Sequence, residues 1–456
     1  MADAALVPTP PVFDLTVETL ILGAGACGLV AALAAAEAGQ EVLVIEADAV
    51  PSGSTALSAG LIPAAGTRAQ AAAGISDDAA RFAADIQAKA KGQNDQGLVD
   101  LMARESGPAV DWLADRYGLP FSVVQDFTYP GHSRHRMHGL PTRSGQELID
   151  ALRTAAEAAG VEIVTQSRGV ALHSSENRVT GLTIERPDGA RESIGCGRLI
   201  LACNGYGGNR EMVARHMPEI RDALWFGHDG NRGDAVNWGT ALGAEVRHLG
   251  AYQGHGNVAH PHGILITWAV ITGGGVQVNL EGRRFWNESQ GYSEAARAVL
   301  AQPGGVAWAI FDARIADTAR QFADFKQAEA QGAVKTAATI TDLAAVTGLP
   351  EDSLRATLAA IPNPGTDEWG RRFDGPPLTP PYKAVKVTGA LFHTQGGLMV
   401  DDRARVRREN GGVIENLYAG GGAACGVSGA GDSGYLSGNG LLAAVTLGRI
   451  AGRDQP

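Results

Sequence analysis

Two glycine-rich stretches of this chain contain residues that could take part in chemistry. The segment GYLSGNGLL (434–442) places Tyr435 within a run of glycines near the C-terminus. Glycine-rich backbone often marks the close approach of a ligand, so this phenol either packs in the core or acts on a bound molecule. The segment GAGACG (23–28) has the glycine spacing of a dinucleotide-binding turn, which holds phosphate groups at the start of a helix.

The elements around the GAGACG turn are those needed to hold a dinucleotide. The apolar run TLIL (19–22) predicts a buried parallel strand, and an alanine-rich helix follows as far as Gly39. EVLVIE (41–46) predicts a second strand, and its last residue, Glu46, would accept hydrogen bonds from a ribose. Each of the three glycines has its own role in the turn. Gly23 permits the tight turn, Gly25 lets the pyrophosphate approach the backbone, and Gly28 lets the helix pack on the strand.

Composition limits the classes of protein to which the chain can belong. Its 456 residues are enough for two or three structural units. Apolar residues make up 45% and charged residues 19%, which is typical of a globular core and argues against a disordered chain. The net charge is −11, so no broad basic face for nucleic acid is expected.

The sequence predicts neither a membrane span, nor an export signal, nor a metal site. No stretch reaches about 18 uninterrupted apolar residues, and the start, MADAALVPTPPVF, lacks the pattern of a signal peptide. We therefore expect a cytoplasmic protein. The four cysteines lack metal-ligand spacing and are expected to be reduced thiols: Cys27, Cys196, Cys203 and Cys425.

Three further segments resemble those of the fumarate reductase/succinate dehydrogenase flavoprotein superfamily. They are PSGSTALSAGLIPAAGT (51–67), RLILACNGYGGN (198–209) and NLYAGGGAACG (416–426). With a single nucleotide fingerprint in the chain, the resemblance implies FAD as the cofactor. The cofactor-binding residues it implies are Gly23, Gly25, Ala26, Gly28, Glu46, Ser54, Thr55, Ser58, Gly60, Ala202, Asn204, Gly205, Gly422, Ser437 and Leu441.

The FAD segments depart from the family pattern in two places. Some members attach FAD to a histidine after the second strand, but there is no histidine between positions 41 and 81. We therefore expect non-covalent FAD. Gly422 stands where the family often has a glutamate, which removes one expected contact to the ribityl chain and points away from the typical fumarate reductases.

Three long motifs resemble the catalytic segments of the same superfamily, in the same order. They are GGGVQVNLEGRRFWNE (273–288), FHTQGGLMVD (392–401) and GYLSGNGLL. In fumarate reductases the last motif carries an arginine that holds a substrate carboxylate, and here that position is Tyr435. A second arginine, which belongs to a proton relay, is replaced by Gly291. Both departures argue against a dicarboxylate substrate.

A narrower resemblance suggests a ketone as the substrate. WNESQGY (286–292) is similar to a segment of 3-ketosteroid dehydrogenases, which implies that Tyr292 removes the proton next to the ketone. Tyr435 and Ser437 match the residues that hold the substrate carbonyl in the Δ4-dehydrogenase branch, where donors stabilise enolate-like charge. The β-hydride then passes to the flavin.

The function predicted from these motifs is FAD-dependent α,β-desaturation of a cyclic ketone. The substrate would be a 3-ketosteroid or a substituted cyclohexanone such as 4-oxocyclohexanecarboxylate. Other candidate catalytic residues are two histidines that match family positions, an arginine in AIFDAR and a tyrosine in the loop FTYPGHSRHRMHGLPTR (127–143), namely His393, His255, Arg314 and Tyr129.

The 127–143 loop also contains three histidines and two arginines of interest. Neither a cysteine nor an evident acid completes a metal site with the histidines, so we predict no metal. The loop is expected to cover the flavin, where Arg134 and Arg136 would meet either a substrate carboxylate or water.

Two other functions stay open at this point. One is a di- or tricarboxylate oxidoreductase of the fumarate reductase type, and the other is a non-enzymatic flavin-binding redox sensor. The sequence does not name the ketone, the bond, the oligomeric state or the electron acceptor, for which quinone, an electron-transfer protein and oxygen are all possible.

The predicted fold class is α/β, a Rossmann-type FAD-binding domain with an inserted α+β capping domain. Residues 15–249 and 394–456 are assigned to the FAD-binding domain and residues 250–393 to the capping domain, which would exclude water from the site. Residues 1–14 are expected to be flexible.

Overall fold

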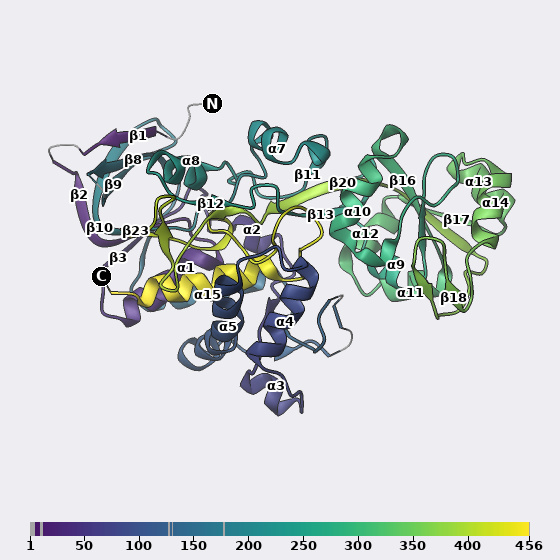
Figure 1. The fold of residues 1–456 in the computed structure, drawn as a ribbon, viewed down its shortest axis with the longest axis horizontal. Coiled ribbons are helices and arrows are strands. Elements are labelled where there is room, and N and C mark those ends of the chain that lie inside the picture. The colour runs from purple at the N-terminus through teal and green to yellow at the C-terminus, as the bar shows by residue number, and fades with distance from the viewer. Residues whose placement is uncertain (1–4, 10–11, 126–127, 130, 177, 456) are drawn as a thin grey trace. The chain divides into compact units, whose positions relative to one another are not determined.

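The computed structural model describes residues 5–9, 12–125, 128–129, 131–176 and 178–455. Contacts divide the chain into two units (Figure 1). Unit 1 comprises Met1–Met217, Gly227–Tyr252 and His393–Pro456, and unit 2 comprises Pro218–Phe226 and Gln253–Phe392. Pro218–Phe226, which the sequence analysis assigned to the first domain, groups with unit 2 because the short strand β11 (Leu224–Trp225) pairs with β20 (Tyr382–Thr394) of that unit.

Unit 1 is built on a sheet with a parallel centre. β23, β10, β2, β3 and β7 pair in parallel in that order, and β9 and β8 extend the sheet in antiparallel fashion from β10. This is the strand arrangement that a βαβ dinucleotide-binding unit requires. The strands are β1 (Ala5–Pro8), β2 (Leu15–Leu22), β3 (Val42–Ile45), β7 (Glu162–Val164), β8 (Arg168–Ser175), β9 (Arg178–Glu185), β10 (Arg191–Leu201), β22 (Arg405–Arg407) and β23 (Val413–Ala419).

Helices and short strands complete unit 1. The helices are α1 (Ala26–Glu37), α2 (Gly53–Ala56), α3 (Arg68–Ala72), α4 (Ala79–Ala90), α5 (Gln96–Tyr117), α6 (Gly145–Ala158), α7 (Arg210–His216), α8 (Asp234–Ala241) and α15 (Asn439–Arg453). The short strands are β4 (Ile62–Pro63), β5 (Ser122–Val123) and β6 (Met137–Gly139), which pair together, and β12 (Val246–Arg247) and β21 (Gly397–Leu398). Helix α1 is apolar on all sides and packs closely against α15 in the core.

Unit 2 is an α+β unit around a mainly antiparallel sheet. Its strands are β11, β13 (Tyr252–Ala259), β14 (Ile264–Leu265), β15 (Val276–Val278), β16 (Val306–Asp312), β17 (Val334–Ala337) and β20, with the separate hairpin β18 (Gly365–Thr366) and β19 (Arg372–Phe373). Its helices are α9 (Ala269–Thr272), α10 (Tyr292–Leu300), α11 (Ala313–Ala319), α12 (Ala323–Ala330), α13 (Ile340–Thr347) and α14 (Glu351–Ala359). The long strand β20 pairs with both β16 and β17, which makes it the centre of the sheet.

The predicted strand, turn, helix and second strand around GAGACG are confirmed as β2, α1 and β3. Further along unit 1, helix α6 is followed by strand β7 and by the hairpin of β8 and β9. Within the segment predicted to be flexible, residues 5–8 instead form β1, which pairs in parallel with β8, so backbone hydrogen bonding orders this part of it. Residues 1–4 and 10–11 of that segment lie outside the described residues.

The described residues contain neither a membrane-spanning helix nor a cluster of metal ligands. Among the helices in the described residues, none is both long and apolar enough to cross a membrane. In the described part of the chain, no group of three or more His, Cys, Asp or Glu side chains could hold a metal ion. The four cysteines are free thiols, and burial raises the pKa of Cys27 to about 12.

Candidate active site

The turn between β2 and α1 has the backbone geometry that a nucleotide phosphate needs. Gly23 has φ +104, and a Cβ at this position would lie 2.5 Å from the Ala202 carbonyl oxygen. A Cβ at Gly28 would lie 1.8 Å from the Gly23 carbonyl oxygen. Only glycine therefore fits at these two positions. Gly25 caps α1 without any side-chain hydrogen bond, which leaves N–H groups at the helix start for an anion.

Glu46 lies beside this turn, as the spacing predicted. Its carboxylate accepts hydrogen bonds from the backbone N–H of Ala24 at 2.7 Å and of Asp48 at 2.8 Å. Burial raises the pKa of Glu46, and these two hydrogen bonds oppose that effect. Each carboxylate oxygen keeps lone-pair capacity for a ribose hydroxyl.

Several other predicted cofactor residues lie near the same turn. Thr55 Oγ1 accepts a hydrogen bond from the backbone N–H of Ala26 at 3.0 Å, which ties α2 to the start of α1. Asn204 has φ 67, and a Cβ at Gly205 would approach both Thr394 and Gly422. Ser58 differs, because its hydroxyl is used locally, donating to the Thr55 carbonyl at 2.7 Å and accepting from the Gly60 N–H at 3.0 Å.

Asn231 is a polar residue at this site that the sequence analysis missed. Its side chain is fully buried and donates from Nδ2 to Ser54 Oγ at 3.2 Å. Its Oδ1 has no hydrogen-bond partner among the described residues. A buried acceptor of this kind costs free energy unless a ligand or water supplies a donor. With the glycine turn and Glu46, this acceptor fits FAD, and Gly23, Gly25, Glu46, Ser54 and Asn231 would hold it.

A prediction follows for Glu46. Replacement by glutamine should weaken FAD binding about tenfold, because one buried N–H loses its charged acceptor and the ribose loses a strong one. Fluorescence titration of the FAD-free protein with FAD would measure the dissociation constant. The control is Glu41→Gln, because Glu41 directly precedes β3 and lies outside the turn. This variant should bind FAD as the wild type does. Equal affinity of the two variants would contradict the role given to Glu46.

A chain of hydrogen bonds in unit 1 leads from α15 to His393. Asn439 Nδ2 donates to Ser428 Oγ at 3.0 Å, and Ser428 Oγ donates to Gln395 Oε1 at 2.7 Å. Gln395 Nε2 lies 3.1 Å from His393 Nδ1. The Thr394 carbonyl oxygen, which can only accept, lies 3.2 Å from the same Nδ1, so this contact favours the proton on Nδ1 whereas the Gln395 contact favours the proton on Nε2. The sequence analysis did not anticipate Gln395, Ser428 or Asn439, although all three lie in or beside its motifs.

His393 and Tyr435 come together in unit 1. Their ring centroids are 5.6 Å apart in an edge-to-face arrangement. The imidazole also lies against the first turn of α15, since a Cβ at Gly440 would be 3.2 Å from it. Burial lowers the pKa of His393 to about 4, so the ring is neutral near pH 7. Tyr435 and Ser437 are buried.

His255 and Tyr292 come together in unit 2. The two rings stack at 5.0 Å with an interplanar angle of 17°. Trp268 meets His255 edge-on at 5.8 Å, and Phe392 stacks on it at 5.6 Å. His255 Nδ1 accepts from the Asn257 N–H at 3.2 Å, which places the ring proton on Nε2. Burial lowers the pKa of His255 to about 3, so this ring is also neutral.

The glutamate of the RRFWNE motif is engaged within unit 2. Glu288 is fully buried and accepts hydrogen bonds from Arg284 and from the Gln277 N–H, and Arg371 Nη1 lies 3.0 Å from it. Asp367 pairs with Arg284 in the same cluster. Two arginines therefore hold Glu288 in place, although Gly291 occupies the position of the relay arginine.

The structure corrects the role expected for Arg136. Its side chain is fully buried and forms ion pairs with Asp77 at 2.7 Å and with Asp85. The guanidinium is therefore committed to two carboxylates of its own chain and does not face a substrate. Arg134 is exposed and donates to the carbonyls of Ser76 and Ser133.

Two candidate catalytic residues do not join the histidine–tyrosine pairs. Arg314 is exposed at the start of α11, where it donates to the Gly273 carbonyl at 3.3 Å and lies 3.7 Å from Asp312. Tyr129 packs against the apolar side chains of Leu61, Val124 and Met137, and burial raises its pKa to about 12. Residues 127 and 130 of the same loop lie outside the described residues.

The comparisons with known proteins decide the family. Residues 18–441 match the model of the FAD binding domain. A probable fumarate reductase of Shewanella frigidimarina is 33% identical over 447 residues, which cover 96% of this chain and 74% of the relative. The chain belongs to the fumarate reductase/succinate dehydrogenase flavoprotein superfamily. It is a FAD-dependent oxidoreductase that acts on CH–CH groups.

Solved structures of this superfamily agree on the fold. The open conformation of a flavocytochrome c3 fumarate reductase matches with a TM-score of 0.82 and 31% identity, covering 96% of this chain and 78% of that one. A 3-ketosteroid-Δ4-(5α)-dehydrogenase from Rhodococcus jostii matches with a TM-score of 0.77 and 22% identity, covering 99% of both. The second likeness shows the fold alone.

A relative that acts on a ketone is similar at a lower identity. The 4-oxocyclohexanecarboxylate 2-dehydrogenase of Sinomonas cyclohexanicum is 26% identical, covering 96% of this flavoprotein and 94% of the relative. The probable fumarate reductase of Shewanella frigidimarina thus resembles this flavoprotein more closely than does the ketone enzyme, which reverses the order suggested by the WNESQGY motif.

Proposed function

We propose that this flavoenzyme reduces the C=C bond of a small enone, in which the double bond is conjugated with an uncharged ketone carbonyl. The higher identity to fumarate reductases supports the reductive direction and a small substrate. Bound FAD, once reduced, would supply the two electrons of this reaction as a hydride and would itself be reoxidised.

The observation that carries the proposal is the neutral pair of His393 and Tyr435. By resemblance, fumarate reductases have at position 435 an arginine that binds a carboxylate. Here the phenol lies edge-to-face with an imidazole whose pKa burial lowers to about 4. Neutral donors suit an uncharged carbonyl oxygen better than a second carboxylate, because no positive charge offsets the desolvation of an anion.

Each of these side chains has a role that its chemistry allows. In the tautomer in which Gln395 donates to Nδ1, His393 Nε2–H and the Tyr435 hydroxyl would donate to the carbonyl oxygen, where negative charge develops as the double bond is reduced. Tyr292 would deliver the proton to the α-carbon. The pKa of a tyrosine phenol is ordinarily ~10. A tyrosine can therefore donate a proton at neutral pH as it stands, whereas it acts as a base only when its pKa is lowered.

A second candidate function is the desaturation of a cyclic ketone such as 4-oxocyclohexanecarboxylate. Tyr435 and Tyr292, at the positions matched in ketosteroid dehydrogenases, favour it, and so does the similarity to the Sinomonas enzyme along nearly its whole length. The same residues would serve, with Tyr292 removing the α-proton instead of adding it.

An anaerobic stopped-flow experiment separates these functions. Reduced enzyme is mixed with crotonate, 2-cyclohexenone or fumarate, and oxidised enzyme with succinate, cyclohexanone, 4-oxocyclohexanecarboxylate or a 3-ketosteroid, while the flavin absorbance is followed. We expect 2-cyclohexenone to reoxidise the flavin at least about tenfold faster than fumarate or crotonate, since each of these acids must place a carboxylate against neutral donors.

The contrary outcomes are specific. Bleaching of oxidised enzyme by a ketone, with no reoxidation by any C=C compound, would establish the second candidate in place of the first. Fastest reoxidation by fumarate or by crotonate would overturn the role of the neutral pair. Tyr435→Arg is the matched variant, and it should shift the preference toward fumarate if residue 435 holds the substrate.

A further inference from the structure

The loop at residues 131–136 packs directly on the segment that carries Tyr435. A Cβ at Gly131, which has φ +87, would lie 2.6 Å from Leu436 Cδ1, so the loop and the segment meet at van der Waals distance. The next residue, His132, donates from Nε2 to the Ser437 carbonyl oxygen at 3.0 Å. One loop therefore contacts two successive residues that follow Tyr435.

His132 is built into the protein and is not a surface histidine. Its side chain is 7% exposed, and its ring packs against Phe82 of α4 with the centroids 6.0 Å apart. Because the Ser437 carbonyl can only accept, the ring proton must lie on Nε2. Nδ1 has no hydrogen-bond partner among the described residues. Burial lowers the pKa of His132 to about 4, so this neutral tautomer persists at physiological pH.

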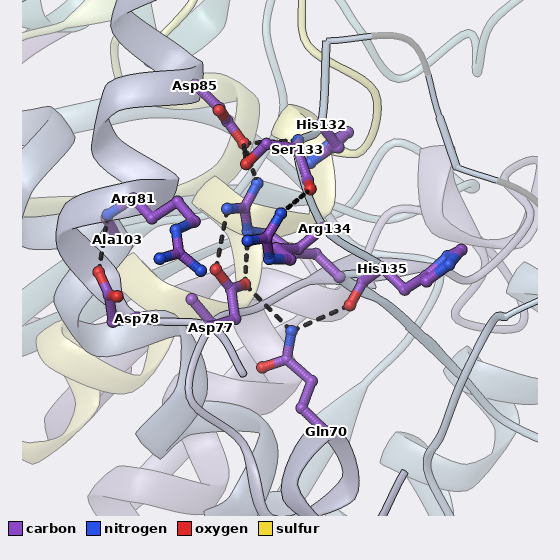
Figure 2. A network of polar contacts seen from close by, with 12 residues as sticks. Gln70, Asp77, Asp78, Arg81, Asp85, Ala103, His132, Ser133, Arg134 and His135 are labelled. Carbon is purple, nitrogen blue, oxygen red and sulfur yellow. Dashed lines mark hydrogen bonds and ion pairs between the residues drawn. The ribbon is translucent and has the colours of Figure 1, made fainter. Parts of the chain in front are cut away.

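A cluster of charges holds the part of the loop that directly follows His132 (Figure 2). Asp85 of α4 accepts hydrogen bonds from the Ser133 N–H and hydroxyl, both at 2.8 Å, and pairs with Arg136. Asp77 accepts two hydrogen bonds from Arg136, at 2.7 and 3.0 Å. The Arg136 guanidinium lies 4.8 Å from the centre of the Phe82 ring, whose neighbour is His132. The loop thus has little freedom to move relative to α4.

From this geometry we propose that His132 is a positioning residue, which sets the orientation of the Tyr435–Ser437 segment through its hydrogen bond to the Ser437 carbonyl. The ion-pair cluster of Asp77, Asp85 and Arg136 holds His132 in turn. The role rests on the proposed function insofar as Tyr435 binds substrate. The mechanical link between loop and segment does not depend on it.

Hydrogen–deuterium exchange of the full-length, FAD-loaded protein tests the link without any substrate. His132→Ala should exchange about fivefold faster in peptides that cover residues 430–438, the effect expected from the loss of one hydrogen bond. His132→Gln should restore slow exchange, since its amide Nε2 can occupy the donor position of the imidazole Nε2. If His132→Ala does not fold, His132→Asn, whose shorter amide does not reach Ser437, takes its place.

His135→Ala is the matched control, because it removes a neighbouring imidazole whose described contact is to Thr128. Unchanged exchange of 430–438 in His132→Ala would overturn the proposal. So would an equal increase in His135→Ala, or a failure of His132→Gln to restore slow exchange.

A kinetic readout then connects the link to catalysis. With the best substrate of the stopped-flow panel, His132→Ala should lower kcat about tenfold, as expected for a misplaced reacting group. The effect should shrink in the Tyr435→Phe background, because both changes act through the same phenol. If the effects of His132→Ala and Tyr435→Phe on kcat were independent, His132 would not act through Tyr435. If the exchange results are as predicted but no compound of the panel is turned over, the proposed function would be contradicted. The mechanical link between the loop and the Tyr435–Ser437 segment would still hold.

Discussion

Replacing Arg136 with methionine is expected to lower the free energy of unfolding by about 3–5 kcal/mol, the usual cost of removing one partner from a buried ion pair. The arginine side chain is fully buried, and so is that of Asp77, while Asp85 is largely buried. Without the guanidinium, two carboxylates would face each other in an environment with little water. Methionine keeps most of the side-chain volume, so the decrease in the free energy of unfolding reports the removal of the charge.

Chemical denaturation of the FAD-loaded protein would measure this effect. Arg134→Met is the matched control, since Arg134 is two residues away, exposed and outside the ion-pair cluster. A surface change of this kind should cost less than about 0.5 kcal/mol. Equal unfolding midpoints for the two variants would contradict the structural role given to Arg136.

The pH dependence of the Arg136→Met deficit has a definite sign. Burial would raise the pKa of Asp85, but hydrogen bonds from Arg136 and Ser133 outweigh it and hold this pKa below its usual range. A carboxyl with a lowered pKa in the folded state stabilises the fold above its unfolded pKa, and that contribution is lost as the pH falls toward the folded value. The deficit should therefore be largest near neutral pH and shrink below about pH 4.

Tyr292→Phe is expected to slow the flavin redox step with the best substrate by at least about 100-fold, which is the usual reach of a general acid or base. FAD binding and thermal stability should be retained, because the phenyl ring can keep the stacking on His255. Anaerobic single-turnover kinetics would measure the rate, and the visible flavin spectrum would report FAD content.

Tyr117→Phe is the control for the loss of a phenol elsewhere. Its hydroxyl lies on α5 and donates to the Leu33 carbonyl at 3.2 Å, in the core packing of unit 1. Its flavin redox rate should equal that of the wild type. A wild-type rate in Tyr292→Phe would show that another group moves the proton, in either direction of the reaction.

Local sequence patterns determined the nucleotide-binding half of this protein. The turn at Gly23 and Gly28, the helix start and the acid at Glu46 lie within about one βαβ unit, where neighbours in the chain are also neighbours in space. The family motifs likewise brought His393 and Tyr435 forward as candidates. In the structure the two side chains lie together in unit 1, with His393 near the end of β20 and Tyr435 just before α15.

Only the tertiary structure decided which polar groups are already paired. Arg136 looked available for a substrate carboxylate, yet its partners Asp77 and Asp85 lie 59 and 51 residues earlier in the chain. His132 meets Ser437 across 305 residues, and Gln395 meets Ser428 across 33. Sequence spacing carries no signal for such pairs. A charge or an amide can be buried only if it has a partner, and the fold brings that partner from a distant part of the chain. The chain therefore specified its cofactor turn and its family locally, while the fold alone determined which side chains stay available for chemistry.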